Sequence, residues 1–155
     1  YSCHVCILQP KSRGRVRLAA NEARTLPLID PAFFADADDM QRMVRGVRRM
    51  REILDQPALA RFEGRELEYS AGARSDEEIE QFIRQYADTI YHPVGTCRMG
   101  PGPLDVVDAE LRVHGLAGLR VVDASIMPRI VSGNTNAPTV MIAEKAAQMI
   151  HAAWK

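Results

Sequence analysis

The sequence predicts an α+β fold in which a mainly antiparallel sheet is flanked by helices. Three observations predict it: short strand-like segments fill the first part of the chain, two helix-like segments follow, and a third helix-like segment ends the chain. The chain has 155 residues, of which 46% are hydrophobic and 26% are charged. That size and composition fit one domain, or one domain with an extension from another.

The first strand-like segment covers residues 1–9, which are apolar or small and have no helical period, as in a strand central to its sheet. Residues 10–14 carry turn signals, and residues 15–19 alternate polar and apolar side chains as an antiparallel strand does. Residues 26–34 contain two prolines and should be extended. Because the chain starts within a strand pattern and without Met, we expect it to be a piece of a longer protein.

Two amphipathic helices are expected next. Residues 36–54 repeat apolar side chains at spacings of three and four, with aspartates in the first turn. The arginines of this segment are more typical of a solvated face than of a binding patch, because the whole chain is neutral. A strand is expected over residues 62–69. Ser75 and Glu78 have the spacing of a capping box, which predicts a helix over residues 76–86.

The last third predicts short strands before a final helix. Residues 106–108 and 111–113 indicate a strand pair, and residues 119–122 a buried strand. Residues 138–154 predict a helix with Pro138 in its first turn, where the missing amide hydrogen costs nothing. Alanines on one face of this helix suit close packing, so we expect the isolated chain to self-associate or to meet a partner there.

Composition limits the partners. Twenty basic and twenty acidic residues cancel, so neither nucleic acid nor an anionic membrane is an expected partner. Cys3 and Cys6 have the spacing of half a zinc site, but no second pair of Cys or His stands close together, and no metal is expected. These cysteines should be reduced and half-buried on a strand. An odd cysteine count without a secretion signal favours the cytoplasm.

Residues 91–100 are the first candidate for chemistry. Pro93 favours an extended backbone at His92, and Gly95 allows close approach of another backbone or a ligand. From spacing alone, a loop histidine held by a hydrogen bond is the simpler interpretation.

Residues 121–139 are the second candidate. A strand ends at Asp123, and a polar loop then enters a helix N-terminus, where free amides favour anionic groups. An ordinary N-cap at Asn134 or Thr135 would explain one polar residue, but not the whole cluster.

These segments resemble the C-terminal part of the glucose–methanol–choline (GMC) oxidoreductase family. The order and the spacing of the family's motifs both agree, which is more specific than any single motif. The matching segments are His92–Met99, Val107–Asp108, Leu111–Gly115, Leu119–Pro128 and Thr135–Thr139, and residues 10–18 extend the likeness to nearly the whole chain.

The resemblance implies FAD as cofactor and oxidation of a primary alcohol to an aldehyde by hydride transfer to flavin. It makes His92 the histidine that assists removal of the alcohol proton. Its partner is Asn136, the residue type of the choline-dehydrogenase-like branch. Imidazole can accept a proton near neutral pH, and a carboxamide can donate a hydrogen bond to the alkoxide. The cofactor-binding residues that the resemblance implies are Asp123, Ala124, Asn136, Pro138 and Thr139.

The resemblance also implies a domain organisation. Residues 1–99 would form the substrate-binding region, and residues 100–155 would carry the catalytic loop, a strand and a helix back to the FAD-binding domain. No Gly-x-Gly-x-x-Gly turn is present, so that domain, which would hold most of the FAD, is expected to be missing from this chain. The chain alone should therefore bind flavin poorly and be inactive. The expected partners are a small alcohol and the missing domain.

Two alternatives stay open. A cyanohydrin lyase on the same fold would also use a histidine, without redox change at the flavin. A non-catalytic binding module would need no histidine at all. Bleaching of flavin by an alcohol without oxygen distinguishes the oxidoreductase from the lyase, and full activity after His92→Ala would favour the module.

Overall fold

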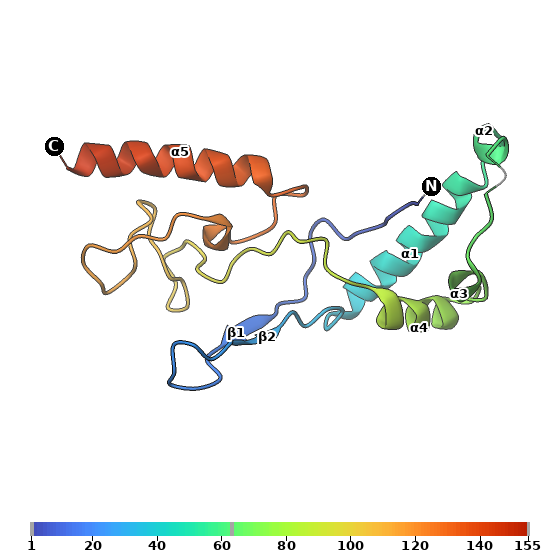
Figure 1. Cartoon of the computed structure of the whole chain (residues 1–155), viewed down its shortest axis with the longest axis horizontal. Coiled ribbons are helices and arrows are strands. Elements are labelled where there is room, and N and C mark those ends of the chain that lie inside the picture. The colour runs from blue at the N-terminus through green and yellow to red at the C-terminus, as the bar shows by residue number, and fades with distance from the viewer. Residues whose placement is uncertain (1, 63, 155) are drawn as a thin grey trace. The chain divides into compact units, whose positions relative to one another are not determined.

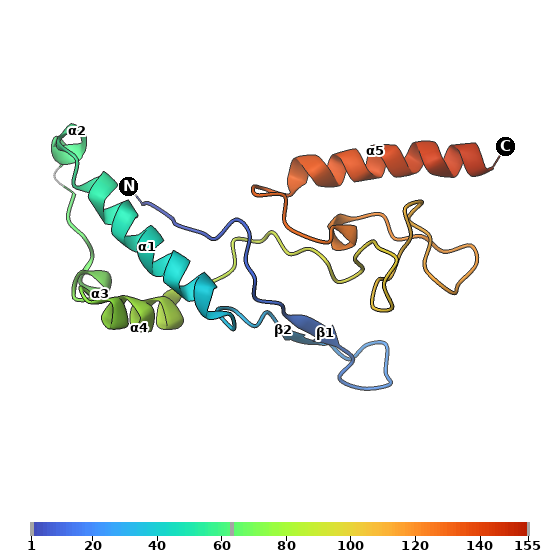
Figure 2. The ribbon, with the colours of Figure 1, turned by 180° about the vertical axis from the view of Figure 1, so that it is seen from behind.

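The computed structural model describes residues 2–62 and 64–154, and the chain packs as two units (Figures 1 and 2). The first unit comprises Tyr1–Gly14 and Ile29–Ile90, and the second comprises Arg15–Leu28 and Tyr91–Lys155. The predicted division between residues 99 and 100 concerns the domains of a longer protein, and it stays a prediction.

The first unit is built on helices α1 (Ala37–Leu54) and α4 (Asp76–Tyr86), which lie side by side (Figure 1). Both predicted helices are confirmed. The first begins one residue late because Asp36 is its N-cap, and the side chain of Asp36 accepts a hydrogen bond from the Asp38 amide at 2.9 Å. The capping box at α4 is also present. The apolar faces of the two helices meet in a cluster of Met40, Val44, Val47, Ile79 and Ile83.

Two short helices connect α1 to α4: α2 (Pro57–Ala60) and α3 (Glu68–Ala71). The strand predicted over residues 62–69 is wrong, because α3 begins within it and its described residues form no strand; Glu63 lies outside the described residues. Arg51 of α1 forms an ion pair with Glu66 in this segment and also binds the backbone just after it. Its guanidinium donates to the backbone oxygens of Ser70 and Ala73 at 2.8 and 2.7 Å.

Residues 2–9 form no strand, so that prediction is wrong for this segment; Tyr1 lies outside the described residues. A strand needs a neighbour for its backbone hydrogen bonds, and this segment instead packs its side chains on α1. An added Cβ at Gly46 would lie 2.6 Å from Val5 Cγ2, so only glycine allows this approach. Cys3 and Cys6 are exposed rather than half-buried.

Asp39 of α1 holds the turn that follows this segment. Its buried carboxylate accepts hydrogen bonds from the Lys11 amide at 2.9 Å, the Ser12 amide at 2.7 Å and the Ser12 hydroxyl at 2.6 Å. Burial raises the pKa of this carboxyl, but the hydrogen bonds and the charge of Arg42 outweigh burial, so the pKa lies below its ordinary value.

The sheet consists of two antiparallel strands, β1 (Arg15–Arg17) and β2 (Leu28–Asp30). Together with the helices, it confirms an α+β fold in this limited form. A larger flanked sheet is not formed by residues 2–62 and 64–154. Both strands are three residues long and exposed, and such short strands are stable only when more strands or a helix cover them.

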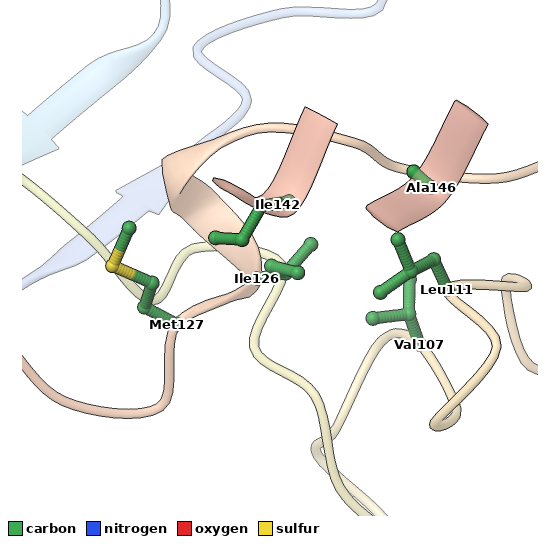
Figure 3. Packing of buried hydrophobic residues seen from close by; sticks show 6 residues of the cluster. All are labelled: Val107, Leu111, Ile126, Met127, Ile142 and Ala146. Atoms are coloured by element: carbon green, nitrogen blue, oxygen red, sulfur yellow. The ribbon is translucent and has the colours of Figure 1, made fainter. Parts of the chain in front are cut away.

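The second unit contains the 3-10 turn η1 (Ala124–Ile126) and helix α5 (Asn136–Ala153). Figure 3 shows Ile142 and Ala146 of α5 above the buried side chains of its cluster: Val107, Leu111, Ile126 and Met127. The final helix is confirmed, and it begins two residues before the predicted start. Among the described residues, no helix has both the length and the apolar character to cross a bilayer.

The strands predicted before α5 reduce to isolated bridges. Val107 pairs with Met99 in parallel and with Val113 in antiparallel, and Arg112 pairs with Arg120. Leu119 is half exposed, so the predicted buried strand at residues 119–122 is wrong in that part. The turn between the first two segments is held by the Asp108 carboxylate, which accepts from the amides of Glu110 and Arg112, both at 2.9 Å.

Candidate active site

His92 lies in the loop after α4 and is half-buried. Its Nδ1 is 3.1 Å from the hydroxyl oxygen of Thr135 and 3.5 Å from the Thr135 amide nitrogen. The preceding residue, Tyr91, has a φ of 64° in the left-handed region, where a bulky side chain is strained. The loop therefore holds the imidazole against the start of α5, 43 residues further along the chain.

Asn136 is the first residue of α5 and is exposed. Within residues 2–62 and 64–154, neither its carboxamide nor Nε2 of His92 makes a hydrogen bond, and none joins these two side chains. The structure thus brings the predicted pair to neighbouring positions, with Thr135 between them, and leaves the polar end of each side chain free for a ligand.

The histidine loop is fixed to the η1 segment by backbone hydrogen bonds. The Cys97 amide donates to the Ser125 oxygen at 3.0 Å, and the Met99 amide donates to the Ile126 oxygen at 2.8 Å. Gly95, with a φ of 91°, lies where an added Cβ would be 3.4 Å from the Met127 oxygen. Glycine is favoured here by its backbone angle, which L side chains rarely adopt.

Asp123 and Ala124 lie at the start of η1, on the segment that these hydrogen bonds join to the histidine loop. The Asp123 side chain accepts from the Ser125 amide at 2.8 Å and stays exposed. Beside it, the hydroxyl of Ser125 is buried, and it has no hydrogen-bond partner among the described residues. An unpartnered buried hydroxyl is uncommon in folded proteins.

Pro138 and Thr139 complete the predicted set in the first turn of α5. Thr139 donates its hydroxyl proton to the Thr135 oxygen at 2.6 Å, so this side chain stabilises the turn. Pro138 has no amide hydrogen and the Thr139 amide donates to the Thr135 oxygen at 3.0 Å, so the amides of Asn136 and Ala137 are the ones left without a carbonyl oxygen within the helix. The start of α5 therefore presents free donors beside the exposed carboxamide of Asn136.

These residues fit a flavin in part. Free amides and the positive end of an 18-residue helix suit the carbonyl-rich edge of a flavin ring. An exposed carboxylate at Asp123 suits the hydroxyl groups of a ribityl chain. Two surface hollows, of about 240 and 210 Å³, lie in the first unit, and none of these residues lines either of them.

A second polar cluster stabilises the turn behind the histidine loop. Arg98 forms an ion pair with Asp105, and the Asp105 carboxylate also accepts from the Gly102 amide at 2.7 Å. The hydrogen bond from Arg98 is the main reason that the pKa of Asp105 lies below its ordinary value. His114 contacts the Gly100 oxygen through Nε2 at 2.9 Å. Asp105 and His114 both bind groups of this turn. We therefore assign them a structural role and do not add them to the candidate site residues.

Thr135 is the residue that sequence reasoning missed. The sequence indicates an ordinary N-cap at this position, and Thr135 is the N-cap of α5. Its side chain makes no cap hydrogen bond and contacts His92 instead. A contact across 43 residues leaves no local signal in one sequence, so only the fold reveals it.

Comparisons with known proteins agree with this picture. The profile of the GMC oxidoreductase family matches residues 10–143. The chain is 52% identical over 150 residues to the alcohol dehydrogenase [acceptor] of Pseudomonas putida, and 47% identical over 150 residues to the oxygen-dependent choline dehydrogenase of Chromohalobacter salexigens. Each alignment covers 97% of this chain and 27% of the relative, so the chain spans about a quarter of the length of these relatives.

Solved structures show the same similarity. The pyridoxine 4-oxidase from "Mesorbium loti" superimposes with a TM-score of 0.85 and 41% identity, over 93% of this chain and 28% of the oxidase. A fungal aryl-alcohol oxidase superimposes with a TM-score of 0.84 and 33% identity, over 95% of this chain and 24% of that one. A formate oxidase of Aspergillus oryzae RIB40, in a study of FAD modification, superimposes with a TM-score of 0.83 and 30% identity, over 93% and 26%.

Proposed function

Because the chain belongs to the GMC oxidoreductase family, whose members depend on FAD, we propose that it is the C-terminal part of an FAD-dependent alcohol oxidoreductase. In this proposal the whole enzyme oxidises a primary alcohol to an aldehyde, as the names of its alcohol and choline dehydrogenase relatives suggest. The observation that supports it most is the meeting of His92 and the start of α5.

The proposed reaction requires two groups from this chain. Oxidation of an alcohol breaks one O–H and one C–H bond, and the carbon loses a hydride. Nε2 of His92, which has no partner in the described chain, accepts the hydroxyl proton. The carboxamide of Asn136 donates a hydrogen bond to the same oxygen as negative charge develops on it.

Bound flavin would accept the hydride, and this chain would hold only one side of it. The free amides of the first turn of α5, with Asn136, would bind the carbonyl edge of the ring. Asp123 and Ala124 would face the ribityl and diphosphate part, beside the unpartnered hydroxyl of Ser125. The remainder of the cofactor site would come from an N-terminal FAD-binding domain.

The exposed surface supports a missing partner domain. The chain exposes 11891 Å². Two separate folded domains of half its mass would together expose about 9,400 Å² by the usual scaling of area with mass. The chain therefore exposes more area than two independent domains of the same total mass would. Large apolar side chains such as Leu104, Val131 and Met141 contribute to this exposed area.

A chimera tests the proposal. This chain would replace the matching segment of the Pseudomonas putida alcohol dehydrogenase, to which it is 52% identical over 150 residues. We expect a yellow chimera whose flavin is bleached by a primary alcohol in the absence of oxygen. The enzyme carrying its own segment is the control for flavin loading and rate.

Two results would contradict the proposal. A flavin-loaded chimera that primary alcohols fail to bleach would exclude alcohol oxidation, and cyanohydrin cleavage by that chimera would assign it to the lyases. Normal bleaching after His92→Ala would make the segment a binding module rather than part of the catalytic site.

A further inference from the structure

The hydroxyl of Thr135 faces the histidine loop rather than its own helix. Thr135 is the N-cap of α5, where a threonine usually binds an amide of the first turn, yet it makes no such hydrogen bond. The residue is only 8% exposed, and its hydroxyl oxygen lies 3.1 Å from Nδ1 of His92. The hydroxyl therefore contacts the histidine ring instead of capping its own helix.

From this contact we infer that Thr135 is a positioning residue for His92, a role that rests on the proposed function of that histidine. Both polar atoms of Thr135 that approach the ring, the hydroxyl oxygen and the amide nitrogen, meet the same atom, Nδ1. Nε2 makes no hydrogen bond within the described residues. The contact therefore assigns Nε2 to the substrate and Nδ1 to the protein.

A hydroxyl suits this position because it can both accept and donate a hydrogen bond. When Nε2 is the base, the neutral ring carries its proton on Nδ1 and donates it to the hydroxyl oxygen. After Nε2 takes the alcohol proton, Nδ1 still carries its own proton and still donates. The Thr135 amide, at 3.5 Å, can only donate and would favour the opposite tautomer. The hydroxyl, at the shorter distance of 3.1 Å, can accept from Nδ1 and so permits the tautomer that the proposed reaction requires.

Three features keep Thr135 and the ring in place. The Thr139 hydroxyl donates to the Thr135 oxygen at 2.6 Å, which fixes the backbone of the cap. Tyr91, before the histidine, is held in the left-handed region, and such strain persists only where surrounding contacts impose it. Gly95, after it, has a φ of 91°, which L side chains rarely adopt. Because both neighbouring segments are held, the imidazole has little freedom to rotate toward another hydrogen-bond partner.

The contact can be tested on the 155-residue chain without flavin or substrate. Long-range ¹H–¹⁵N NMR spectra resolve the two nitrogens of each imidazole, and the chain has four histidines. His92→Gln assigns the signals. We expect Nδ1 of His92 to carry the proton in the neutral form and its shift to change in Thr135→Val but not in Thr135→Ser. A bare Nδ1 in the neutral ring, or no change in Thr135→Val, would overturn the inference.

The consequence for catalysis is tested in the flavin-loaded chimera. Thr135→Val keeps the shape of the side chain, and we expect a roughly tenfold slower anaerobic reduction of flavin, with an altered pH dependence and little change in KM. Thr135→Ser should restore the rate. Thr25→Val, at an exposed turn, is the matched control and should leave the rate unchanged.

The two proposals fail in different ways. If the unsubstituted chimera does not reduce its flavin, the proposed function fails, and the NMR result still decides whether Thr135 holds Nδ1. If that chimera is active and Thr135→Val matches it in rate and pH dependence, the positioning role fails while the function stands.

Discussion

Individual polar side chains determine the local geometry in both units. In the second unit, the Thr135 hydroxyl holds the ring of His92 at 3.1 Å. In the first, the buried carboxylate of Asp39 accepts hydrogen bonds from Lys11 and Ser12. Each contact crosses a long stretch of sequence, and each joins a loop to the first residues of a helix or to the residue before it. In each unit, a loop is therefore held in place by residues at the N-terminus of a helix, α5 for the His92 loop and α1 for residues 11–12.

Asp39 should make the stability of the chain depend on acid. Its pKa is depressed in the folded state below the ordinary value of 3.8, so the carboxylate stabilises the fold above that pH. The stabilisation should be lost as the pH falls from about 4 through the lower folded pKa. We expect Asp39→Asn to lower the free energy of unfolding at pH 7 and to flatten its decline below pH 4. Urea unfolding at several pH values measures both, and an unchanged acid slope would contradict the assignment.

From the sequence, individual site residues could be predicted only where they belong to a family motif. His92 and Asn136 follow from the motif string, and the fold puts them at neighbouring positions, although their convergence on one ligand stays a prediction. Asp123, Ala124, Pro138 and Thr139 as cofactor residues also stay predictions. Thr135 could not be predicted, because its partner is distant in sequence and its type suits an ordinary cap.

Among the elements, α5 matters most for the site because its first turn carries Asn136. Its hold on the second unit comes from a few buried side chains, chiefly Ile142 and Ala146, which meet Leu111 and Ile126 (Figure 3). Most other side chains of α5 are exposed. The position of the first turn therefore depends on a narrow apolar contact.

Truncating this contact should be costly. We expect Ile142→Ala to lower the free energy of unfolding by about 2–4 kcal/mol, because it removes a buried side chain and leaves a cavity. Val140→Ala, on an exposed position of the same helix, should change it by about 0.5 kcal/mol or less. Chemical denaturation followed by circular dichroism compares the two variants. Equal losses would mean that α5 is not held through Ile142.

Helices could be predicted well and strands poorly, for a physical reason. The helices over 37–54, 76–86 and 136–153 satisfy their own backbone hydrogen bonds, and their apolar periodicity is local. The segments at 2–9 and 62–69 have the composition of strands, but a strand forms only beside a neighbour. The described chain provides none for them.

At the scale of the whole molecule, the main features are the short span relative to known relatives and the large exposed surface. The chain spans 27% of the length of the relatives that it resembles, and it exposes more area than folded units of its mass usually do. The predicted cofactor residues line neither of the two hollows of the first unit. A partner domain that covers this surface would complete both the site and the core.

The chain alone should therefore not retain flavin. We expect FAD mixed with the 155-residue chain to separate from it on gel filtration, because this sequence has no Gly-x-Gly-x-x-Gly turn of the kind that holds a dinucleotide. The chimera should elute yellow under the same conditions. Tight one-to-one binding of FAD by the chain alone would contradict this division of the cofactor site.

The central claim is that His92 and Asn136 act on one oxygen atom, and a double-mutant cycle on flavin reduction tests it most directly. In the anaerobic chimera, His92→Ala should slow reduction by about 10²–10⁴-fold and Asn136→Ala by about 10²–10³-fold. The fold-loss of rate in the double variant should be much smaller than the product of the two single fold-losses. Groups that stabilise one transition state do not act independently. Losses that simply multiply, or a normal rate in His92→Ala, would show that the two side chains do not share a substrate.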